Sequence, residues 1–337
     1  MDLSSSYMGI AMDNPIVATS TPLTKDGVDA VMGLVEAGAG AIVLHSLFEE
    51  QIEMEGKALV HNLERGSESF PEALTYFPRV EDFKMGPEEY LRLIQEVKRR
   101  TYVPVIGSIN GTTLGGWVKY ARLIEEAGAD GLELNLYLSP IYKEIEGKDL
   151  EDILVSLVKE VRRQTSLPLS VKISPFFTSI PNVCHRLVRA GANGLALFNR
   201  FYEPDLDLKN MELVMRPKLS SSYEMLLPMR WIAALYGKIE ADFLLTTGVK
   251  TGLDAAKALA VGARAVGVAS AILQNGPSHI GKMLEELKST LEELGYGSAR
   301  ELVGVASNTA IGDPLQYEFE RIHYMKVLLG YDPDHLY

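Results

Sequence analysis

Short apolar runs alternate with amphipathic stretches along most of the chain. Four of these runs share one pattern, in which Gly-Ala precedes an apolar segment of strand length, at 38–46, 128–136, 191–199 and 262–270. Glycine at the end of a helix adopts the left-handed conformation that residues with a Cβ atom resist. A short apolar run after such a helix end is typical of a strand buried on both faces. The pattern therefore predicts a repeated helix–strand unit.

Four further apolar segments complete a set of eight predicted strands. They lie at 14–20, 103–108, 167–174 and 241–248. Amphipathic helices are predicted between the strands and after the last one, at 26–37, 87–100, 114–127, 150–165, 180–190, 223–236, 253–261 and 278–294. The alternation of strands with helices favours an α/β fold built of parallel βα units.

A closed (β/α)8 TIM barrel is the simplest arrangement of eight such units, and a doubly wound open sheet is the alternative. No linker rich in Pro, Gly and Ser divides the chain, so residues 1–337 are predicted to form one domain. A long insertion after the second strand, 47–86, is interpreted as a lid or a subunit contact. The stretch 199–223 is a second lid candidate or a solvated loop, and 295–337 is expected to form a C-terminal helical extension.

Composition places the chain among ordinary globular proteins, with 47% hydrophobic and 23% charged residues. Its 33 Lys and Arg against 45 Asp and Glu give a net charge of −12, which argues against nucleic-acid or anionic-membrane partners. The N-terminal residues lack the features of a signal peptide, and no apolar run is long enough to predict a membrane span. Cys184 is the single cysteine, so no internal disulfide, iron–sulfur cluster or thiolate zinc site is expected, and a reducing, cytoplasmic setting is the natural interpretation.

In an eight-stranded barrel the chemistry is placed where the strands end. Those ends carry mainly hydroxyl and amide side chains, at Thr19, Ser20, His45, Ser46, Ser108, Asn110, Asn135, Lys172, Ser174, Asn199, Thr246, Thr247 and Ser270. The set is poor in carboxylates, so no metal site is expected, because a divalent-metal site usually needs two or three acids. The direction of Glu133, on the fourth strand, stays open at this point.

Lys172 lies inside the apolar fifth strand, a position that lysine rarely takes without a partner. It is interpreted as a Schiff-base amine or as a fixed positive charge facing an anionic ligand. A buried stem with its ammonium group at the rim is the structural alternative. His45, at the end of the second strand, is either an acid–base group or hydrogen-bond donor, or a histidine satisfied beneath the lid.

Small residues follow the seventh and eighth strands, at 246–249 and 268–271. Loops at these positions commonly bind phosphate in eight-stranded barrels, because backbone N–H groups can approach an anion there. Tight packing of strand against helix is the alternative. Asn135 and Asn199 can each donate and accept hydrogen bonds, which suits the edge of a heterocycle. Together with Lys172, these features indicate a pocket for a phosphorylated heterocycle.

A set of short motifs runs in order along the chain: NPIVATS (14–20), ELN (133–135), VKIS (171–174), Asn199, TGVKTGLDA (247–255) and GARAVGVASAI (262–272). Through this set the chain resembles the dihydroorotate dehydrogenase family of FMN-containing (β/α)8 barrels, from about residue 14 to residue 272. The resemblance implies an FMN-dependent dehydrogenase acting on CH–CH bonds, in a family that serves pyrimidine biosynthesis. It would pass a hydride between flavin N5 and a small planar carbonyl or dihydropyrimidine substrate.

The resemblance also implies roles for the matching residues. Those implied to line the isoalloxazine ring, the ribityl chain and the substrate are Ala18, Thr19, Ser20, His45, Ser46, Asn110, Asn135 and Asn199. Those implied to hold the phosphate are Thr247, Gly248, Val249, Ala269 and Ser270. Lys172 is implied to bind near N1 and the C2 carbonyl, where negative charge grows on reduction, which agrees with its interpretation as a fixed charge.

Three positions depart from the family's pattern. The third residue after the asparagine of strand four is the family's base, and here it is Leu138, which cannot take a proton. Ser139 beside it is the candidate catalytic residue, with Tyr137, His45 or water as alternatives. His45 itself stands where the family has lysine, and Pro140 stands where the family has a substrate-binding asparagine.

Three functional hypotheses follow. The first is an FMN oxidoreductase resembling dihydroorotate dehydrogenase, with a soluble electron acceptor. The second is a non-redox barrel enzyme that uses Lys172 on a phosphorylated metabolite, and the third is a flavin-binding subunit of a larger redox complex. We expect a small-molecule ligand and a homo-oligomer in each case, no nucleic-acid or membrane partner, and a redox partner protein for the flavin hypotheses.

Overall fold

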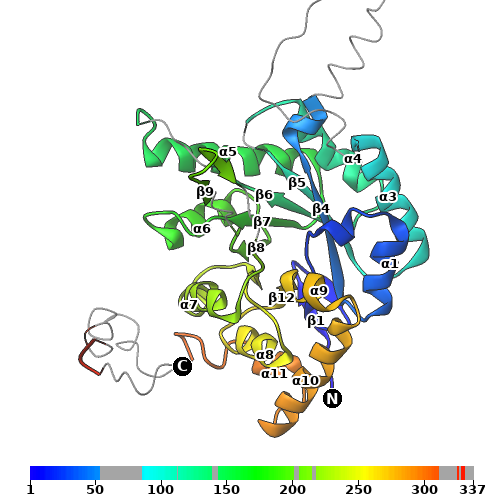
Figure 1. The fold of residues 1–337 in the computed structure, drawn as a ribbon, viewed down its shortest axis with the longest axis vertical. Coiled ribbons are helices and arrows are strands. Elements are labelled where there is room, and N and C mark those ends of the chain that lie inside the picture. The colour runs from blue at the N-terminus through cyan, green and yellow to red at the C-terminus, as the bar shows by residue number, and fades with distance from the viewer. Residues whose placement is uncertain are drawn as a thin grey trace, which may run out of the picture.

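A closed barrel of eight parallel strands, surrounded by helices, forms the body of the protein (Figure 1). The computed structural model describes residues 1–53, 86–111, 113–138, 143–200, 205–214 and 218–310, together with 325 and 328–330. The strands follow one another around the barrel in chain order, and the last pairs with the first. The predicted TIM barrel is therefore confirmed, and the open sheet is excluded.

The barrel strands match the eight predicted segments, although two of them run two residues further than predicted. They are β3 (Ile16–Ala18), β4 (Ala41–Phe48), β5 (Val105–Asn110), β6 (Gly131–Asn135), β7 (Leu169–Ile173), β8 (Gly194–Leu197), β11 (Asp242–Leu245) and β12 (Ala265–Val268). The four glycines of the repeated Gly-Ala pattern have φ between 95° and 119°, at Gly38, Gly128, Gly191 and Gly262. This is the left-handed region that the pattern predicts.

Helices cover the outside of the barrel. They are α1 (Val28–Glu36), α3 (Pro87–Arg100), α4 (Tyr120–Glu126), α5 (Gly147–Gln164), α6 (Ile180–Arg189), α7 (Leu226–Leu235), α8 (Gly252–Ala260), α9 (Ser270–Asn275), α10 (His279–Glu293) and α11 (Ala299–Leu302). Short 3₁₀ turns precede three of them, η1 (Pro22–Thr24), η3 (Gly116–Lys119) and η4 (Ser222–Met225). The main hydrophobic core lies between this helical layer and the barrel.

Helix α3 illustrates how the local sequence specifies an element. Pro87 occupies the first turn, where a missing N–H is tolerated, and Glu88 and Glu89 lie at the positive end of the helix dipole. The last turn is basic, which suits the negative end. The apolar residues repeat at helical spacing, and the buried face consists of Pro87, Tyr90, Leu93, Ile94 and Val97. This face packs toward β5 and places Tyr90 behind the barrel wall.

An antiparallel hairpin at the N-terminus covers the end of the barrel at which the strands begin. It consists of β1 (Ser5–Tyr7) and β2 (Ile10–Met12), and its side chains join the cluster that fills the barrel interior. The hydroxyl of Tyr7 lies 2.7 Å from that of Ser170 on β7. A Cβ atom at Gly194 would lie 2.8 Å from the Tyr7 hydroxyl, so only glycine fits at this point of β8. The hairpin was not predicted, because its strands are short and partly polar.

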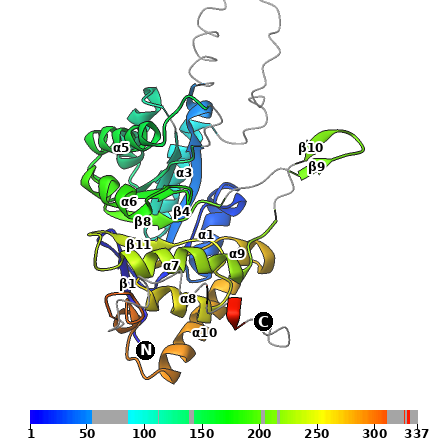
Figure 2. The ribbon, with the colours of Figure 1, turned by 90° about the vertical axis from the view of Figure 1, so that its left-hand side faces the viewer.

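Two long connections were predicted at the other end of the barrel, where the strands end. β4 runs to Phe48 and is followed by a helical segment at 49–53, while 54–85, the remainder of the predicted lid or subunit contact, lies outside the described residues. Within the stretch 199–223, β9 (Asp205–Asp207) and β10 (Glu212–Val214) pair as a hairpin that projects away from the barrel (Figure 2). This part of the stretch is therefore a β-hairpin and not a plain loop.

In the described part of the predicted extension 295–337, the named helix is the four-residue α11, which packs against α8, and residues 303–310 form turns; α10 corresponds instead to the helix predicted at 278–294. Residues 311–324, 326–327 and 331–337 lie outside the described residues. None of the described helices is long and apolar enough to cross a membrane.

Candidate functional site

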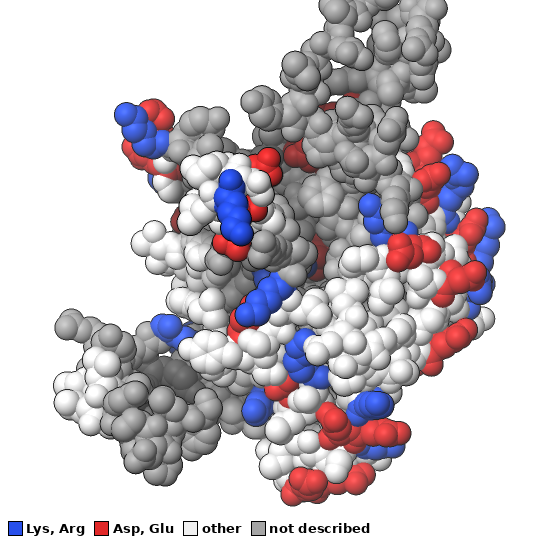
Figure 3. All heavy atoms as spheres, in the orientation of Figure 1, with Lys and Arg blue, Asp and Glu red and all other residues white. Residues whose placement is uncertain are grey.

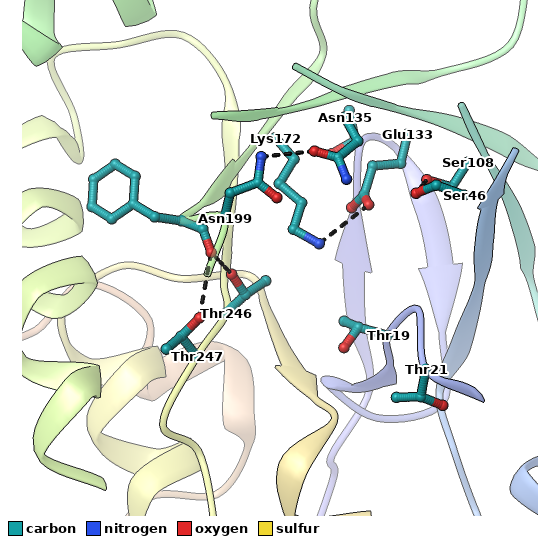
Figure 4. Close-up of polar contacts among 12 residues, drawn as sticks. Thr19, Thr21, Ser46, Ser108, Glu133, Asn135, Lys172, Asn199, Thr246 and Thr247 are labelled. Atoms are coloured by element: carbon teal, nitrogen blue, oxygen red, sulfur yellow. Dashed lines mark hydrogen bonds and ion pairs between the residues drawn. The ribbon is translucent and has the colours of Figure 1, made fainter. Parts of the chain in front are cut away.

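A cavity of about 780 Å³ opens at the carboxyl ends of the barrel strands. Thirteen of the predicted site residues lie on its wall: Thr19, Ser20, His45, Ser46, Asn110, Asn135, Lys172, Asn199, Thr247, Gly248, Val249, Ala269 and Ser270. They come from all eight strands and the turns that follow them, and Figure 4 shows how several of them converge. The structure therefore brings residues that are far apart in the chain to the wall of one cavity.

Of the residues with an implied cofactor or catalytic role, two are not on this wall, and among the other predicted strand-end residues Ser174 lines a different cavity and Ser108 is fully buried. Ala18 is buried in the core between the barrel and the helices, because strand alternation turns Val17 and Thr19 inward and Ala18 outward. Ser139 lies outside the described residues. Leu138, which the resemblance implies to stand at the base position, lines a separate cavity of about 310 Å³ between the ends of β6 and β7 and helix α5, whereas Tyr137 faces the large one.

Lys172 points into the barrel and forms an ion pair with a buried carboxylate. Its Nζ atom lies 3.6 Å from Oε1 of Glu133, and the two side chains are 13% and 1% exposed (Figure 4). Neither carboxylate oxygen of Glu133 has a hydrogen-bond partner among the described residues. In the register of β6 with β7, Glu133 pairs with Ser170 and Asn135 pairs with Lys172. Glu133 and Lys172 are therefore diagonal neighbours on the same face of the two strands. The open question about Glu133 is therefore answered, since it faces inward.

The two predicted amides are hydrogen-bonded to each other. Nδ2 of Asn199 donates to Oδ1 of Asn135 over 2.7 Å. This leaves the amide group of Asn135 as a donor and the carbonyl of Asn199 as an acceptor, with no other partner among the described residues. A donor beside an acceptor on the same wall is complementary to the edge of a planar amide-containing ring.

His45 reaches the cavity through an irregularity in β4. The register between β4 and β5 passes from Val43↔Ile106 to Ser46↔Ser108, so three steps on β4 match two on β5. Such a bulge changes the direction of a side chain, and it allows the neighbours His45 and Ser46 both to line the cavity.

Contacts on either side hold the His45 ring. Its Nδ1 atom lies 3.1 Å from the carbonyl oxygen of Thr24, and its ring meets that of Tyr90 edge to face at 5.0 Å. Burial is the main cause that lowers the pKa of His45, the Thr24 hydrogen bond opposes it, and the charge of Lys25 adds to the lowering. Behind the ring, burial raises the pKa of Tyr90, which exchanges hydrogen bonds with the backbone of Ser108.

The turns after β11 and β12 form the opposite end of the cavity. The hydroxyl of Thr246 donates to the carbonyl of Phe198 over 2.7 Å, and Thr247 and Gly248 both have positive φ, 77° and 87°. A Cβ atom at Gly248 would lie 2.5 Å from the backbone nitrogen of Met225, so no other residue fits without displacement. The turn after β11 is therefore packed tightly against the backbone at Ser221 and Met225.

Ser220 is a site residue that the sequence did not reveal. Its hydroxyl lies 2.8 Å from the hydroxyl of Ser270 and accepts a hydrogen bond of 3.3 Å from the N–H of Gly248. It stands on the long connection after β8, for which no motif indicated a polar contact. Ser220 thus ties this connection to the turns after β11 and β12.

Charged residues at the cavity mouth were also not predicted. Lys25 and Asp26 follow η1, and Arg200 follows the strand end at Asn199. The Nε atom of Arg200 lies 3.2 Å from Oε1 of Glu224 in η4. Lys25 and Arg200 are thus balanced by Asp26 and Glu224, so the charges named at the mouth are of both signs.

The charged side chains on the face drawn in Figure 3 are of both signs. Figure 3 shows acidic and basic side chains interspersed on the outer helices of this face, with a mostly uncharged centre. No continuous basic stripe, as nucleic-acid binding requires, is visible among the residues drawn there. The described ranges contain no cluster of three or more His, Cys, Asp or Glu residues placed to hold a metal ion.

Comparison with known proteins gives one family and several relatives. The family model described as "Dihydroorotate dehydrogenase" matches residues 81–291. The catalytic subunit of dihydroorotate dehydrogenase B (NAD(+)) from Thermoplasma acidophilum is 25% identical over 317 residues, which cover 90% of this chain and 99% of that protein. The same subunit from Desulforudis audaxviator is 30% identical over 233 residues, 66% of this chain and 74% of that protein.

A relative with a different substrate in its name is about as similar. The NAD-dependent dihydropyrimidine dehydrogenase subunit PreA of Escherichia coli K12 is 26% identical over 326 residues, which cover 92% of this chain and 78% of that protein. The relatives thus agree on the family but not on one substrate.

Proposed function

The chain belongs to the dihydroorotate dehydrogenase family, and we propose that it passes a hydride between FMN and a small planar carbonyl compound or dihydropyrimidine. Enzymes of this family are FMN-dependent oxidoreductases that act on CH–CH bonds. Family membership speaks against the non-redox use of Lys172. The observation that carries the proposal is the inward-facing Lys172, whose ammonium group is nearly buried on the wall of a large cavity.

The donor set of the cavity suits FMN. Its volume, about 780 Å³, lies in the range of cofactor sites, roughly 300–1,000 Å³. It offers a cation at Lys172, an amide donor and acceptor at Asn135 and Asn199, and backbone groups packed closely around Gly248. Bound FMN would supply a ring that accepts a hydride at N5, and the chain's own residues would hold and orient it.

The proposed cofactor contacts divide by position in the cavity. Lys172 would stabilise the negative charge that reduction places on the ring. The ring and ribityl contacts would come from Thr19, Ser20, His45, Ser46, Asn110, Asn135 and Asn199. The phosphate contacts would come from Thr247, Gly248, Val249, Ala269 and Ser270, to which we add Ser220.

An anaerobic titration tests the proposal. The purified holoprotein is mixed with dihydroorotate, 5,6-dihydrouracil or small unsaturated carbonyl compounds, and the flavin absorption is followed. We expect stoichiometric FMN, and either bleaching by one of the dihydropyrimidines or reoxidation of the dithionite-reduced protein by a carbonyl compound. A colourless protein that does not take up FMN would refute the cofactor assignment.

A second candidate function is that of a flavin-binding subunit in a redox complex. All three relatives described above are named as subunits, and the single buried cysteine cannot supply the ligand set of an iron–sulfur cluster. This reading predicts that the holoprotein is bleached by dithionite but by none of the small molecules, and that reduction requires a partner protein. Rapid bleaching of the isolated chain by a dihydropyrimidine would exclude it.

A further inference from the structure

We propose that His45 is the acid–base residue of the site, which takes up the proton that a CH–CH substrate releases on oxidation. The inference rests on the proposed function, because it needs a substrate beside the bound flavin. It supplies a proton acceptor in place of Leu138, whose side chain has none and lines a different cavity.

The hydrogen bond of His45 fixes the tautomer that this role requires. A backbone carbonyl can only accept, so Nδ1, 3.1 Å from the oxygen of Thr24, must carry the proton. In the neutral ring Nε2 is then the acceptor. No described residue donates to Nε2, and His45 lines the cavity, so its lone pair is available to a ligand.

The surroundings of His45 favour its neutral form. The groups that face it among the described residues are the Thr24 carbonyl and the Lys25 side chain from the η1 segment, and the Tyr90 ring from α3. Tyr90 is fully buried and its hydroxyl is bonded to the backbone of Ser108, so it adds no charge. Burial and Lys25 together lower the pKa of His45, which keeps the ring able to accept a proton at neutral pH.

The other groups on the wall are less suited to this role. The hydroxyl of Ser46 is engaged with that of Ser108 at 2.8 Å. Tyr137 also lines the cavity, but its phenol hydroxyl carries a proton to donate, whereas the unprotonated nitrogen of a neutral imidazole only accepts. The ammonium group of Lys172 is paired with Glu133 and can only donate. His45 is thus the group that the bulge in β4 brings to the cavity with a free acceptor.

The balance of the step is simple. The substrate loses one hydrogen as a proton to Nε2 of His45, which becomes an imidazolium, and the electron pair of that C–H bond forms the new C=C bond. The neighbouring carbon loses its hydrogen as a hydride, which the bound FMN accepts. In the reverse direction the imidazolium returns the proton as a hydride is added.

The variant His45→Asn tests this role directly, because its amide nitrogen can still donate to Thr24 while the acceptor at Nε2 is removed. Single-turnover bleaching is measured against pH with dihydroorotate or 5,6-dihydrouracil, whichever reduces the wild-type holoprotein. We expect a rate at least about 100-fold lower at neutral pH and loss of the acidic limb of the pH profile. His185→Gln, on the exposed face of α6, is the matched control and should behave as the wild type. A rate within threefold of wild type with the same limb would overturn the proposal.

A second measurement does not depend on the substrate. Nitrogen NMR of the histidines in the full-length holoprotein reports which ring nitrogen of His45 carries the proton. An Nδ1–H tautomer with a pKa below the ordinary value of about 6.5 is expected. An Nε2–H tautomer would overturn the assignment even if the flavin is reduced normally. If the wild type binds FMN but neither dihydropyrimidine bleaches it, the proposed substrate class fails. The NMR measurement still shows whether Nε2 of His45 is free to accept a proton.

Discussion

The ammonium group of Lys172 and the carboxylate of Glu133 form a buried ion pair 3.6 Å apart, and the carboxylate has no hydrogen-bond partner among the described residues. Removing one member of such a pair leaves the other as an uncompensated charge, which costs about 3–5 kcal/mol. The pair therefore links the stability of the barrel to the chemistry of the cavity.

A double-mutant cycle measures this link. Lys172→Met in the apoprotein should lower the free energy of unfolding by about 3 kcal/mol, because Glu133 is left charged inside the barrel. Adding Glu133→Leu should restore most of the loss, because an apolar pair of similar volume needs no compensation. Urea unfolding of the four proteins in the cycle provides the measurement. Losses that simply add would show that the two charges do not interact.

The same pair should set the redox properties of the flavin. Lys172→Ala removes a positive charge and should weaken FMN binding or slow flavin reduction more than tenfold, about 1.4 kcal/mol. Glu133→Gln removes the opposing negative charge and should shift the midpoint potential upward, because reduced flavin is then stabilised by an unopposed cation. Potentiometric titration of the flavin shows whether the midpoint potentials of the two variants shift in opposite directions. Shifts of the same sign in both variants would contradict the electrostatic explanation.

Gly248 offers a test of the close backbone approach at the cavity. Gly248→Ala should reduce FMN affinity and stability together, because its Cβ atom would lie 2.5 Å from the backbone nitrogen of Met225. Gly276→Ala is the matched control, since Gly276 has a similar φ, 81° against 87°, but nothing within 4 Å of the added atom. Thermal melts and FMN titration of both variants separate the effect of φ from that of the clash. Equal losses would mean that the clash is relieved at no cost.

Ser220 should affect only the phosphate end of the cofactor. Ser220→Ala removes a partner of Gly248 and Ser270, and the loss of a hydrogen bond, about 0.5–1.5 kcal/mol, should weaken FMN binding roughly threefold to tenfold. Riboflavin, which has no phosphate, should bind equally to variant and wild type. Ser289→Ala, on the exposed face of α10, serves as the control. Parallel losses for FMN and riboflavin would place the effect elsewhere.

The lowered pKa of His45 has a consequence for stability. The folded-state pKa lies below the unfolded value of about 6.5, so the unfolded chain takes up the proton first as pH falls. The contribution of His45 to folding is therefore complete above that value and is lost at lower pH. Thermal melts between neutral and mildly acidic pH should show a smaller decline for His45→Asn than for the wild type. An identical decline would show that His45 is not desolvated in the folded protein.

Much of the fold and of the site could be predicted, because both follow from repetition. Glycine at helix ends and apolar runs of strand length identified all eight strands, and parallel strands in a barrel bring their carboxyl ends together. That single rule placed His45, Lys172 and Asn199 in one cavity. The position of Ala18 was predicted less well, because the motif that contains it does not show where strand alternation turns a side chain away from the cavity.

Other features depend on contacts that have no local signature. Glu133 and Lys172 are far apart in sequence, and only the register of β6 with β7 brings them together. Ser220 meets Ser270 across 50 positions of the chain, through a connection without a motif. The bulge in β4 that turns His45 inward is a property of the pairing with β5, which a single strand sequence does not reveal.

The N-terminal hairpin fills the amino-terminal end of the barrel, since Tyr7 and Met12 pack into its interior on the side away from the cavity mouth. A hydride donor and a hydride acceptor that both reach the flavin from the cavity mouth would therefore bind one after the other, and steady-state kinetics with two small molecules should follow a ping-pong pattern.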